Sequence, residues 1–464
     1  MASEFRLDYG RSLTAGPSQL VAAWVEDDAL SDVELVAVRQ GVAEVICDAG
    51  LFSMNVADYC PRVPSLFPVR TPNDRVSSSN HRPNGNPRHE GSMLYERIAR
   101  MKHLNVGIYG VGTYLPDQVR SNDFWSEPAR RSWVERRRRQ AGLTAVLKAG
   151  PKNAEAGPGE QIIISELERS KDDIFQGVDE RRVMAEEMVS SDMEVSAAEQ
   201  ALACSGIRAQ DVDFILTHSL VPDRLGSPNA SAVQRQLGMR QDTLAMATEG
   251  ACNSFQQQLL LAQAMIQTGS FRHGLIIQSA APSRLLHMED QISVTLGDGA
   301  AAAVLGPVSA ERGILGAAHF CDGSVSPTAV CDPIDSPWYS ARRNVFHVVD
   351  SKQGRKMLLS VADISNRAIN EALRKAGLTA PDIDFYASHQ GAKWMRRITQ
   401  EHAGLASARF VDTFSRTGSL FSANIPFQLA EGCRMGMIND GDAVAMFSGG
   451  TGITWAATTL RWGH

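Results

Sequence analysis

The chain has 464 residues, of which 43% are apolar and 21% are charged, and its formal net charge is −6. This length allows two domains or one large two-lobed domain, and the negative charge excludes a general attraction to nucleic acid or to an anionic membrane surface. No apolar run approaches the ~20 residues of a membrane helix, and the seven cysteines are dispersed without a CxxC pair. We therefore expect a cytoplasmic protein with reduced thiols and no metal site.

Residues 1–100 differ from the rest of the chain. A moderately apolar stretch is followed by residues 70–92, which are rich in Asn, Pro, Ser and Gly and have almost no large apolar side chains. Such a composition cannot bury enough surface to order itself and predicts a linker or disordered segment. We expect residues 1–100 to be an N-terminal extension, with Met93 or Met101 as a candidate start of the compact protein.

A second irregular segment, an insertion at about residues 126–173, follows the expected strand and glycine turns of residues 104–116. It carries four consecutive arginines, Arg136 to Arg139. A run of this kind is usually a solvated helix face. Contact with phosphate, nucleic acid or an acidic carrier protein is the alternative.

An internal repeat organises the remaining chain. Residues 196–219 align with residues 366–390, and the pairs Gly206/Gly377 and His218/His389 both lie 171 residues apart. Each copy has an amphipathic helix, a glycine stop, an acidic turn and an apolar strand that ends in histidine. The alternation of strands and helices predicts two mostly parallel sheets, related by pseudo-symmetry, with helices between them and outside them.

Cys252 lies where an apolar strand turns into a helix that Gly269 should end. Unpaired amides and the helix dipole at such a start favour a thiolate, although inert packing is the commoner role of a buried cysteine. His389 ends a strand of the second repeat, and Ser419 lies in the second-half counterpart of the cysteine turn. A histidine near a thiol is the usual activating group, and the glycine-rich loop 448–452 has amides for a thioester carbonyl.

The motifs of this chain are similar to those of a known family. Residues 104–462 resemble the ketoacyl-carrier-protein synthase III branch of the thiolase superfamily, through NVGIYGVGTYLP, EGACNSF, LGDGAAAAVLG, SHQGAKWMRRI, TGSLFSANIPFQLA and FSGGTGITWAATTLRW in the expected order. The resemblance implies an α/β fold, the thiolase-like αβαβα five-layered sandwich. Its N-terminal half (residues 101–310) would carry the nucleophilic cysteine and its C-terminal half (residues 311–464) the catalytic histidine.

The resemblance also implies roles for individual residues. Cys252 would be the acylated nucleophile, and His389 its base and later a donor. The amides of Cys252 and Thr451 would form the oxyanion hole, with Gly450 and Gly452 allowing a close approach of the loop. No cofactor is expected, because the acyl group arrives as an acyl-CoA or phosphopantetheine-linked thioester. The expected partners are a second copy in a homodimer and an acyl carrier protein.

The chain departs from the family's pattern at two places. Ser419 stands where the family has a catalytic Asn, in Gly418-Ser419-Leu420-Phe421, and losing one preorganised donor costs about a hundred- to thousandfold in rate. Asn424 matches a small residue of the family and is not expected to compensate. Lys171 and Phe175 fall where the family's coenzyme A site has Trp and Arg, so Trp125 and Trp133 of the insertion are candidates for rebuilding the mouth of the tunnel.

Asn424, Phe175 and Trp394 are the candidate substrate-binding residues. Packing or capping is the alternative for Asn424, and a structural role is the alternative for Trp394.

We therefore predict an acyltransferase in which Cys252 takes an acyl group and passes it to a hydroxyl, amine or carrier thiol in polyketide-type biosynthesis. The first alternative is decarboxylative condensation with a malonyl-carrier thioester, which would make the chain a 3-oxoacyl-carrier-protein synthase III. The second alternative is a non-catalytic homologue that binds acyl carriers.

Overall fold

The computed structural model describes residues 34–39, 42–47, 50–55, 105–148 and 157–464. The chain divides into two compact units, residues 1–85 and residues 86–464. In the first unit, the described residues form a three-stranded antiparallel sheet of β1 (Glu34–Arg39), β2 (Val42–Cys47) and β3 (Gly50–Asn55). The expected linker at 70–92 and the candidate starts Met93 and Met101 lie outside the described residues.

The second unit contains two large sheets, one from each copy of the repeat. The first has five strands in the order β4-β10-β9-β7-β8, namely β4 (Asn105–Tyr114), β7 (Phe214–Ser219), β8 (Leu244–Ala247), β9 (Gly274–Ala280) and β10 (Gly299–Val308). The second has four strands in the order β11-β16-β15-β14, namely β11 (Gly313–Cys321), β14 (Phe385–Ser388), β15 (Ala443–Gly450) and β16 (Thr454–Arg461).

Both large sheets are mixed, so the prediction of mostly parallel sheets is wrong. Only β7-β8, β7-β9 and β14-β15 are parallel, whereas β4-β10, β9-β10, β11-β16 and β15-β16 are antiparallel. A parallel pair needs a crossover, which the helices supply after β7 and β14. The strands that close each half follow one another without an α-helix between them and therefore pair antiparallel.

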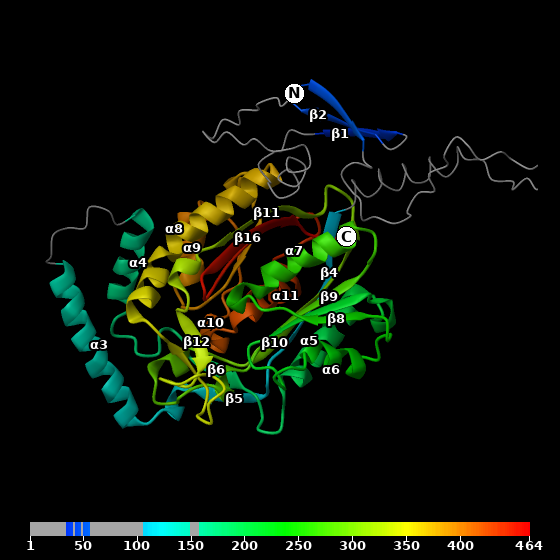
Figure 1. Cartoon of the computed structure of the whole chain (residues 1–464). Helices are drawn as coiled ribbons and strands as arrows, with labels where there is room; N and C mark the ends of the chain where they lie inside the picture. Colours follow the sequence, from blue (N-terminus) through cyan, green and yellow to red (C-terminus); the bar gives the residue numbers. More distant parts are fainter. Residues whose placement is uncertain (1–33, 40–41, 48–49, 56–104, 149–156) are drawn as a thin grey trace, which may run out of the picture. The chain divides into compact units, whose positions relative to one another are not determined.

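Helices cover the sheets in five layers, α-β-α-β-α, as the resemblance implied (Figure 1). On the outside, α5 packs against β4, β9 and β10, and α8 packs against β11, β15 and β16. Between the sheets, α7 contacts β4, β9 and β16, and α11 contacts β4, β10 and β14. Three hydrophobic clusters fill the spaces between these layers, and the central one includes side chains of both sheets. The helices of these layers are α5 (Ser190–Ser205), α7 (Ser254–Gln267), α8 (Ser351–Ala376) and α11 (Asn424–Arg434).

The predicted repeat is visible in how its helices end. Gly206 follows α5 with φ +70°, and Gly377 follows α8 with φ +66°. A residue in the left-handed backbone conformation ends a helix without strain only when it has no Cβ. Glycine meets this requirement at both positions, where the chain turns towards the strands β7 and β14. Gly269 ends α7 in the same way, at φ +75°.

The remaining elements surround this framework. The insertion contains α3 and α4, and α4 contacts α8 (Figure 1). None of the described helices is long and apolar enough to cross a membrane. The elements are β5 (Gln118–Ser121), α3 (Glu127–Lys148), α4 (Pro158–Arg169), β6 (Glu180–Val183), α6 (Asn229–Gln236), β12 (Ala329–Asp332), β13 (Val345–Val348), α9 (Met395–His402) and α10 (Phe414–Thr417).

Candidate active site

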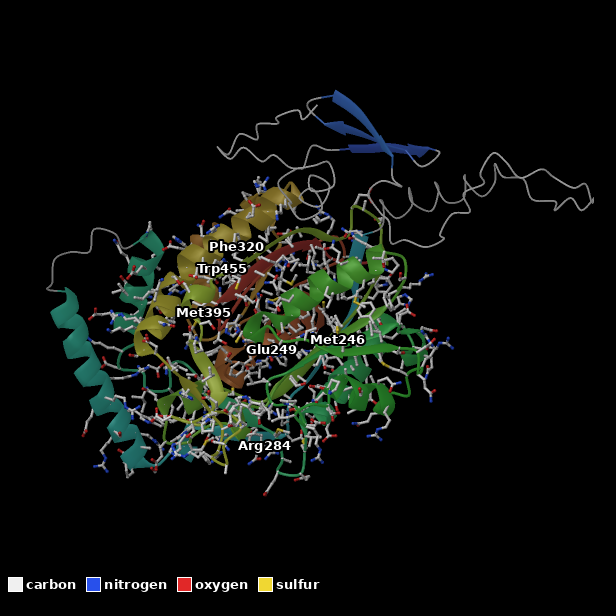
Figure 2. All side chains as sticks on the ribbon, viewed as in Figure 1. Met246, Glu249, Arg284, Phe320, Met395 and Trp455 are labelled. Carbon is white, nitrogen blue, oxygen red and sulfur yellow. The ribbon has the colours of Figure 1, made fainter. Side chains whose placement is uncertain are left out.

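Cys252 lies in a tight turn between β8 and α7. Met246 and Glu249, labelled in Figure 2, lie where β8 ends and the chain enters this turn. The turn is the short 3-10 helix η4 (Ala251–Asn253), and Ala251 adopts φ +49°, a backbone conformation that costs a non-glycine residue roughly 1–3 kcal/mol. Two local bonds hold this conformation: the Ala251 N–H donates to Glu249 Oε1 at 2.7 Å, and the Gly250 N–H donates to Ser254 Oγ at 2.9 Å.

The surroundings of Cys252 oppose ionisation of its thiol. The side chain is partly exposed and packs in a hydrophobic cluster with Phe421, Leu286 and Leu296. Burial raises the pKa of the Cys252 thiol to about 12, and the negative charge of Glu249 adds to the rise. The expectation that the helix start favours a thiolate is therefore wrong. A helix dipole is worth about 0.3–1 kcal/mol, which is less than the desolvation of a buried anion.

We expect Glu249→Gln to speed alkylation of Cys252 by iodoacetamide by about threefold at pH 8, because it removes a negative charge beside the thiol and keeps the oxygen that accepts the Ala251 N–H. The effect is modest because the Glu249 side chain is 77% exposed and water screens its charge. Mass spectrometry of the separate cysteine peptides gives the rate. Glu199→Gln, an exposed position on α5, is the matched control, and an equal rate in both variants would contradict the role of Glu249.

The glycine-rich loop between β15 and β16 meets the cysteine turn at Gly450. A Cβ at Gly450 would lie 2.7 Å from the Gly250 carbonyl oxygen and 3.3 Å from the Asn253 nitrogen, so only glycine allows this approach. Ser448 Oγ donates to Asn253 Oδ1 at 2.6 Å, which joins the loop to the same turn. Thr451 and Gly452 follow, with Gly452 at φ +113°. The loop that is predicted to complete the oxyanion hole thus touches the nucleophile turn.

His389 follows β14 and faces a second turn that resembles the first. This turn is the 3-10 helix η9 (Phe421–Ala423), in which Phe421 adopts φ +52°, as Ala251 does in η4. His389 Nδ1 lies 3.2 Å from the Phe421 carbonyl oxygen and 3.0 Å from Asn424 Nδ2. Burial lowers the pKa of the His389 imidazole to about 4, so the ring is neutral at physiological pH.

Phe421 connects the two predicted catalytic residues. Its side chain shares the hydrophobic cluster of Cys252, its carbonyl oxygen faces His389, and the turns η4 and η9 contact each other. Ser419 is also buried, and its Oγ accepts from Asn424 Nδ2 at 3.2 Å and from the Phe421 N–H at 3.4 Å. The fold therefore brings Cys252, His389, Ser419 and Asn424 to one place from both halves.

From the sequence, His218 is expected to be a structural or tunnel-lining residue, and no role is predicted for Glu249 or Ser422. His218 is buried, and its Nδ1 lies 2.8 Å from Ser422 Oγ while its Nε2 lies 3.2 Å from Glu249 Oε1. Because Glu249 also accepts the Ala251 N–H, this chain of bonds joins η9 to the cysteine turn. The pairing of His218 with His389 in the repeat was the signal that pointed to this position.

A groove of about 560 Å³ is lined by Ala392, Lys393 and Trp394, which follow His389 closely in the sequence. Residues of the insertion, including Arg137 and Lys171, also line it. Trp394 is only 8% exposed and packs with Ile163 of α4 as well as lining the groove.

Arg137 is partly buried, and its guanidinium donates to the carbonyl oxygens of Ser170, Lys171 and Asp173, at 3.2, 3.1 and 2.7 Å. It is therefore not part of a solvated helix face, because these carbonyls at the end of α4 need a donor. Arg136 forms an exposed ion pair with Asp290, whereas the side chains of Arg138 and Arg139 lie outside the described residues.

Phe175 is not among the residues that line this groove. It packs in an aromatic cluster with Trp125 and Trp133, and both indole nitrogens donate to backbone carbonyls of residues 288–289. Trp125 is 3% exposed and Trp133 is fully buried. These tryptophans anchor the insertion to the first half and are not at the mouth of the groove.

Known proteins share both the motifs and the fold. Residues 246–323 match the family model of 3-oxoacyl-[acyl-carrier-protein (ACP)] synthase III, and residues 373–462 match that of its C-terminal part. A beta-ketoacyl-[acyl-carrier-protein] synthase III of Geobacillus kaustophilus is 32% identical over 289 residues, which cover 62% of this chain and 88% of the relative. The chain belongs to the 3-oxoacyl-[acyl-carrier-protein] synthase III family.

Further similarity extends over the whole length of such proteins. The beta-ketoacyl-[acyl-carrier-protein] synthase III of Bacillus pumilus is 29% identical over 365 residues, which cover 78% of this chain and all of the relative. The crystal structure of 3-oxoacyl-[acyl-carrier-protein] synthase III from Aquifex aeolicus superposes with a TM-score of 0.61 at 23% identity, over 77% of this chain and all of that one. The thiolase-like α/β fold is thus confirmed, and the family assignment makes the chain an enzyme of the acyltransferase type.

Proposed function

We propose that this 3-oxoacyl-carrier-protein synthase III family member takes an acyl group onto Cys252 and condenses it with a malonyl-carrier thioester. The observation that carries the proposal is the convergence of Cys252 and His389 on Phe421, with the buried Asn424 amide 3.0 Å from the imidazole. The names of the relatives support condensation over transfer to a hydroxyl, amine or carrier thiol. Transfer to those acceptors remains the second candidate, favoured by Ser419 in place of the family's Asn.

The first step acylates the cysteine. The sulfur of Cys252 attacks the thioester carbonyl of the donor, the oxyanion is held by the amides of Cys252 and Thr451, and the donor sulfur leaves with the proton that Cys252 loses. The raised pKa of the resting thiol favours loss of its proton during the attack over ionisation beforehand.

The second step forms the carbon–carbon bond. The malonyl thioester loses CO₂, and its electron pair passes to an enolate whose oxygen needs a hydrogen-bond donor. The enolate carbon then attacks the acyl-Cys252 carbonyl, and the sulfur of Cys252 leaves and regains one proton. A neutral His389 suits this step because it can donate from Nε2, and Ser419 Oγ–H offers a second, weaker donor.

The donor's pantetheine arm is proposed to reach the site through the groove beside Trp394. Lys171, Lys393 and Arg397, which line the groove, suit a phosphate, whether of coenzyme A or of a carrier protein. A homodimer is also proposed, and β8 forms an edge of the five-stranded sheet with Leu244 exposed, where a second copy can pair.

Incubation with acetyl-CoA or acyl-carrier protein is expected to raise the intact mass by one acyl group, and Cys252→Ala should abolish the gain. Cys321→Ala, at an exposed cysteine, is the control that should keep it. Addition of malonyl-carrier protein should then release CO₂ and yield a β-ketoacyl product. Release of the acyl group onto an alcohol or amine without CO₂ would support the second candidate, and no adduct on Cys252 would refute both.

A further inference from the structure

The orientation of the Asn424 side-chain amide is determined by its neighbours. Asn424 is the first residue of α11 and is fully buried. The Leu420 N–H lies 3.1 Å from Asn424 Oδ1, and a backbone N–H can only donate, so the oxygen end of the amide is engaged there. The NH₂ end consequently faces the other two groups, His389 Nδ1 at 3.0 Å and Ser419 Oγ at 3.2 Å.

The orientation of the Asn424 amide indicates which ring nitrogen of the neutral His389 imidazole carries its single proton. A proton on Nδ1 would donate to the Phe421 carbonyl at 3.2 Å, but the Asn424 NH₂ beside it would then have no acceptor on the imidazole. A lone pair on Nδ1 accepts from the NH₂ at the shorter distance of 3.0 Å. The second amide hydrogen then reaches Ser419, and both hydrogens of the buried NH₂ are satisfied, as a buried polar group requires.

The opposite edge of the ring, at Nε2, lies beside Gly391. A Cβ at Gly391 would come within 3.1 Å of His389 Nε2, so glycine keeps the space beside this nitrogen free of a side chain. We infer that Asn424 is a positioning residue that holds His389 as the Nε2–H tautomer, so that the imidazole presents a donor and not a base to the reacting atoms. This inference rests on the proposed condensation. An Nε2–H donor on His389 would favour condensation over acyl transfer to an alcohol or water.

The chemical consequence follows from the position of the proton. An Nε2–H group stabilises the enolate oxygen of a decarboxylating malonyl thioester, but it cannot take a proton from an alcohol or water that attacks acyl-Cys252. The family pattern has its Asn at the position of Ser419. In this chain a side-chain amide is present five residues later, at Asn424, where it acts through His389. Ser419 accepts from the same amide and remains a donor in its own right.

The nearly isosteric variant Asn424→Asp should reverse this arrangement. One carboxylate oxygen would still accept the Leu420 N–H, while the other would face His389 Nδ1 and draw the proton to it, which frees Nε2 as a base. We expect two-bond ¹H–¹⁵N spectra of ¹⁵N-histidine-labelled full-length protein to show the Nε2–H tautomer for His389 in the wild type and a proton on Nδ1 in Asn424→Asp. The His389→Gln spectrum assigns the signal.

Activity provides a second readout. In Asn424→Asp, the ratio of condensation to hydrolysis of acyl-Cys252 should fall about tenfold or more, since a donor is replaced by a base. Asn370→Asp, an exposed position on α8, is the matched control and should change neither the spectrum nor the ratio. If Asn424→Asp does not fold, Asn424→Ser takes its place and should give a mixture of tautomers.

The outcomes of these experiments distinguish the positioning role of Asn424 from the proposed condensation, on which that role rests. A wild-type His389 that carries its proton on Nδ1 would overturn the role of Asn424, whatever the enzyme produces. An Nε2–H signal in the wild type, together with the absence of CO₂ and β-keto product, would leave the positioning role intact and refute condensation. An unchanged ratio in Asn424→Asp would also overturn the inference.

Discussion

Gly450→Ala is expected to slow acylation of Cys252 by about a hundredfold or more. The new Cβ would lie 2.7 Å from the Gly250 carbonyl oxygen, so the loop or the cysteine turn must move. Either movement separates the Cys252 amide from the loop that is proposed to share its oxyanion hole, and an ångström of misplacement costs about two orders of magnitude in rate. Single-turnover acylation by acetyl-CoA, followed by intact mass, measures the effect.

The neighbouring glycine supplies the control for this prediction. A Cβ at Gly449 would meet its nearest atoms at 3.8 and 3.9 Å, which is ordinary van der Waals contact. Gly449→Ala should therefore acylate at a rate within about threefold of the wild type, as a substitution without a steric clash does. Equal rates in the two variants would show that the close approach of the loop at Gly450 is not needed for acylation.

Gly112→Ala is expected to lower the free energy of unfolding by about 3 kcal/mol, at the upper end of what overpacking costs. Gly112 lies in β4 under α5, and a Cβ there would come within 2.2 Å of the Ala197 carbonyl oxygen and 2.4 Å of the Ala201 nitrogen. These are backbone atoms of a helix, so the helix as a whole must shift away from the sheet. Urea unfolding followed by tryptophan fluorescence gives the change.

A glycine in open surroundings is the matched control for Gly112→Ala. No atom lies within 4 Å of a Cβ built at Gly323, and its φ is not in the left-handed region. Gly323→Ala should leave the unfolding free energy unchanged or raise it by up to about 1 kcal/mol, because alanine restricts the unfolded chain. A loss of stability at Gly112 no larger than that at Gly323 would contradict the close packing of α5 on β4.

Gly316 repeats the situation of Gly112 in the second half. A Cβ there would lie 2.3 Å from the Ala372 carbonyl oxygen and 2.6 Å from the Ala376 nitrogen. The glycine therefore lets α8 pack closely on β11, as Gly112 lets α5 pack closely on β4. The repeat that was read from His218 and His389 therefore extends to how closely each outer helix lies on its sheet. These glycines are scattered in the sequence, and only the packing shows why each must lack a side chain.

Some features of this protein followed from the sequence by itself. The helix ends at Gly206, Gly269 and Gly377 were predictable because a left-handed turn after an apolar helical pattern is a local property of a few residues. The two halves followed from a constant spacing along the chain, and the family followed from motifs in a fixed order. The roles of Cys252 and His389 were named from those motifs and remain to be tested by acylation.

Other features were decided only by the tertiary structure. Strand direction depended on which strands become neighbours, so the mixed sheets were missed. The pKa of Cys252 depended on what covers the thiol, and the helix-start position alone predicted the wrong direction. The contact of Asn424 with His389 joins residues 35 positions apart whose local patterns indicate only capping or packing. Burial and hydrogen bonding between distant segments are properties of the folded chain, because they arise only when those segments meet.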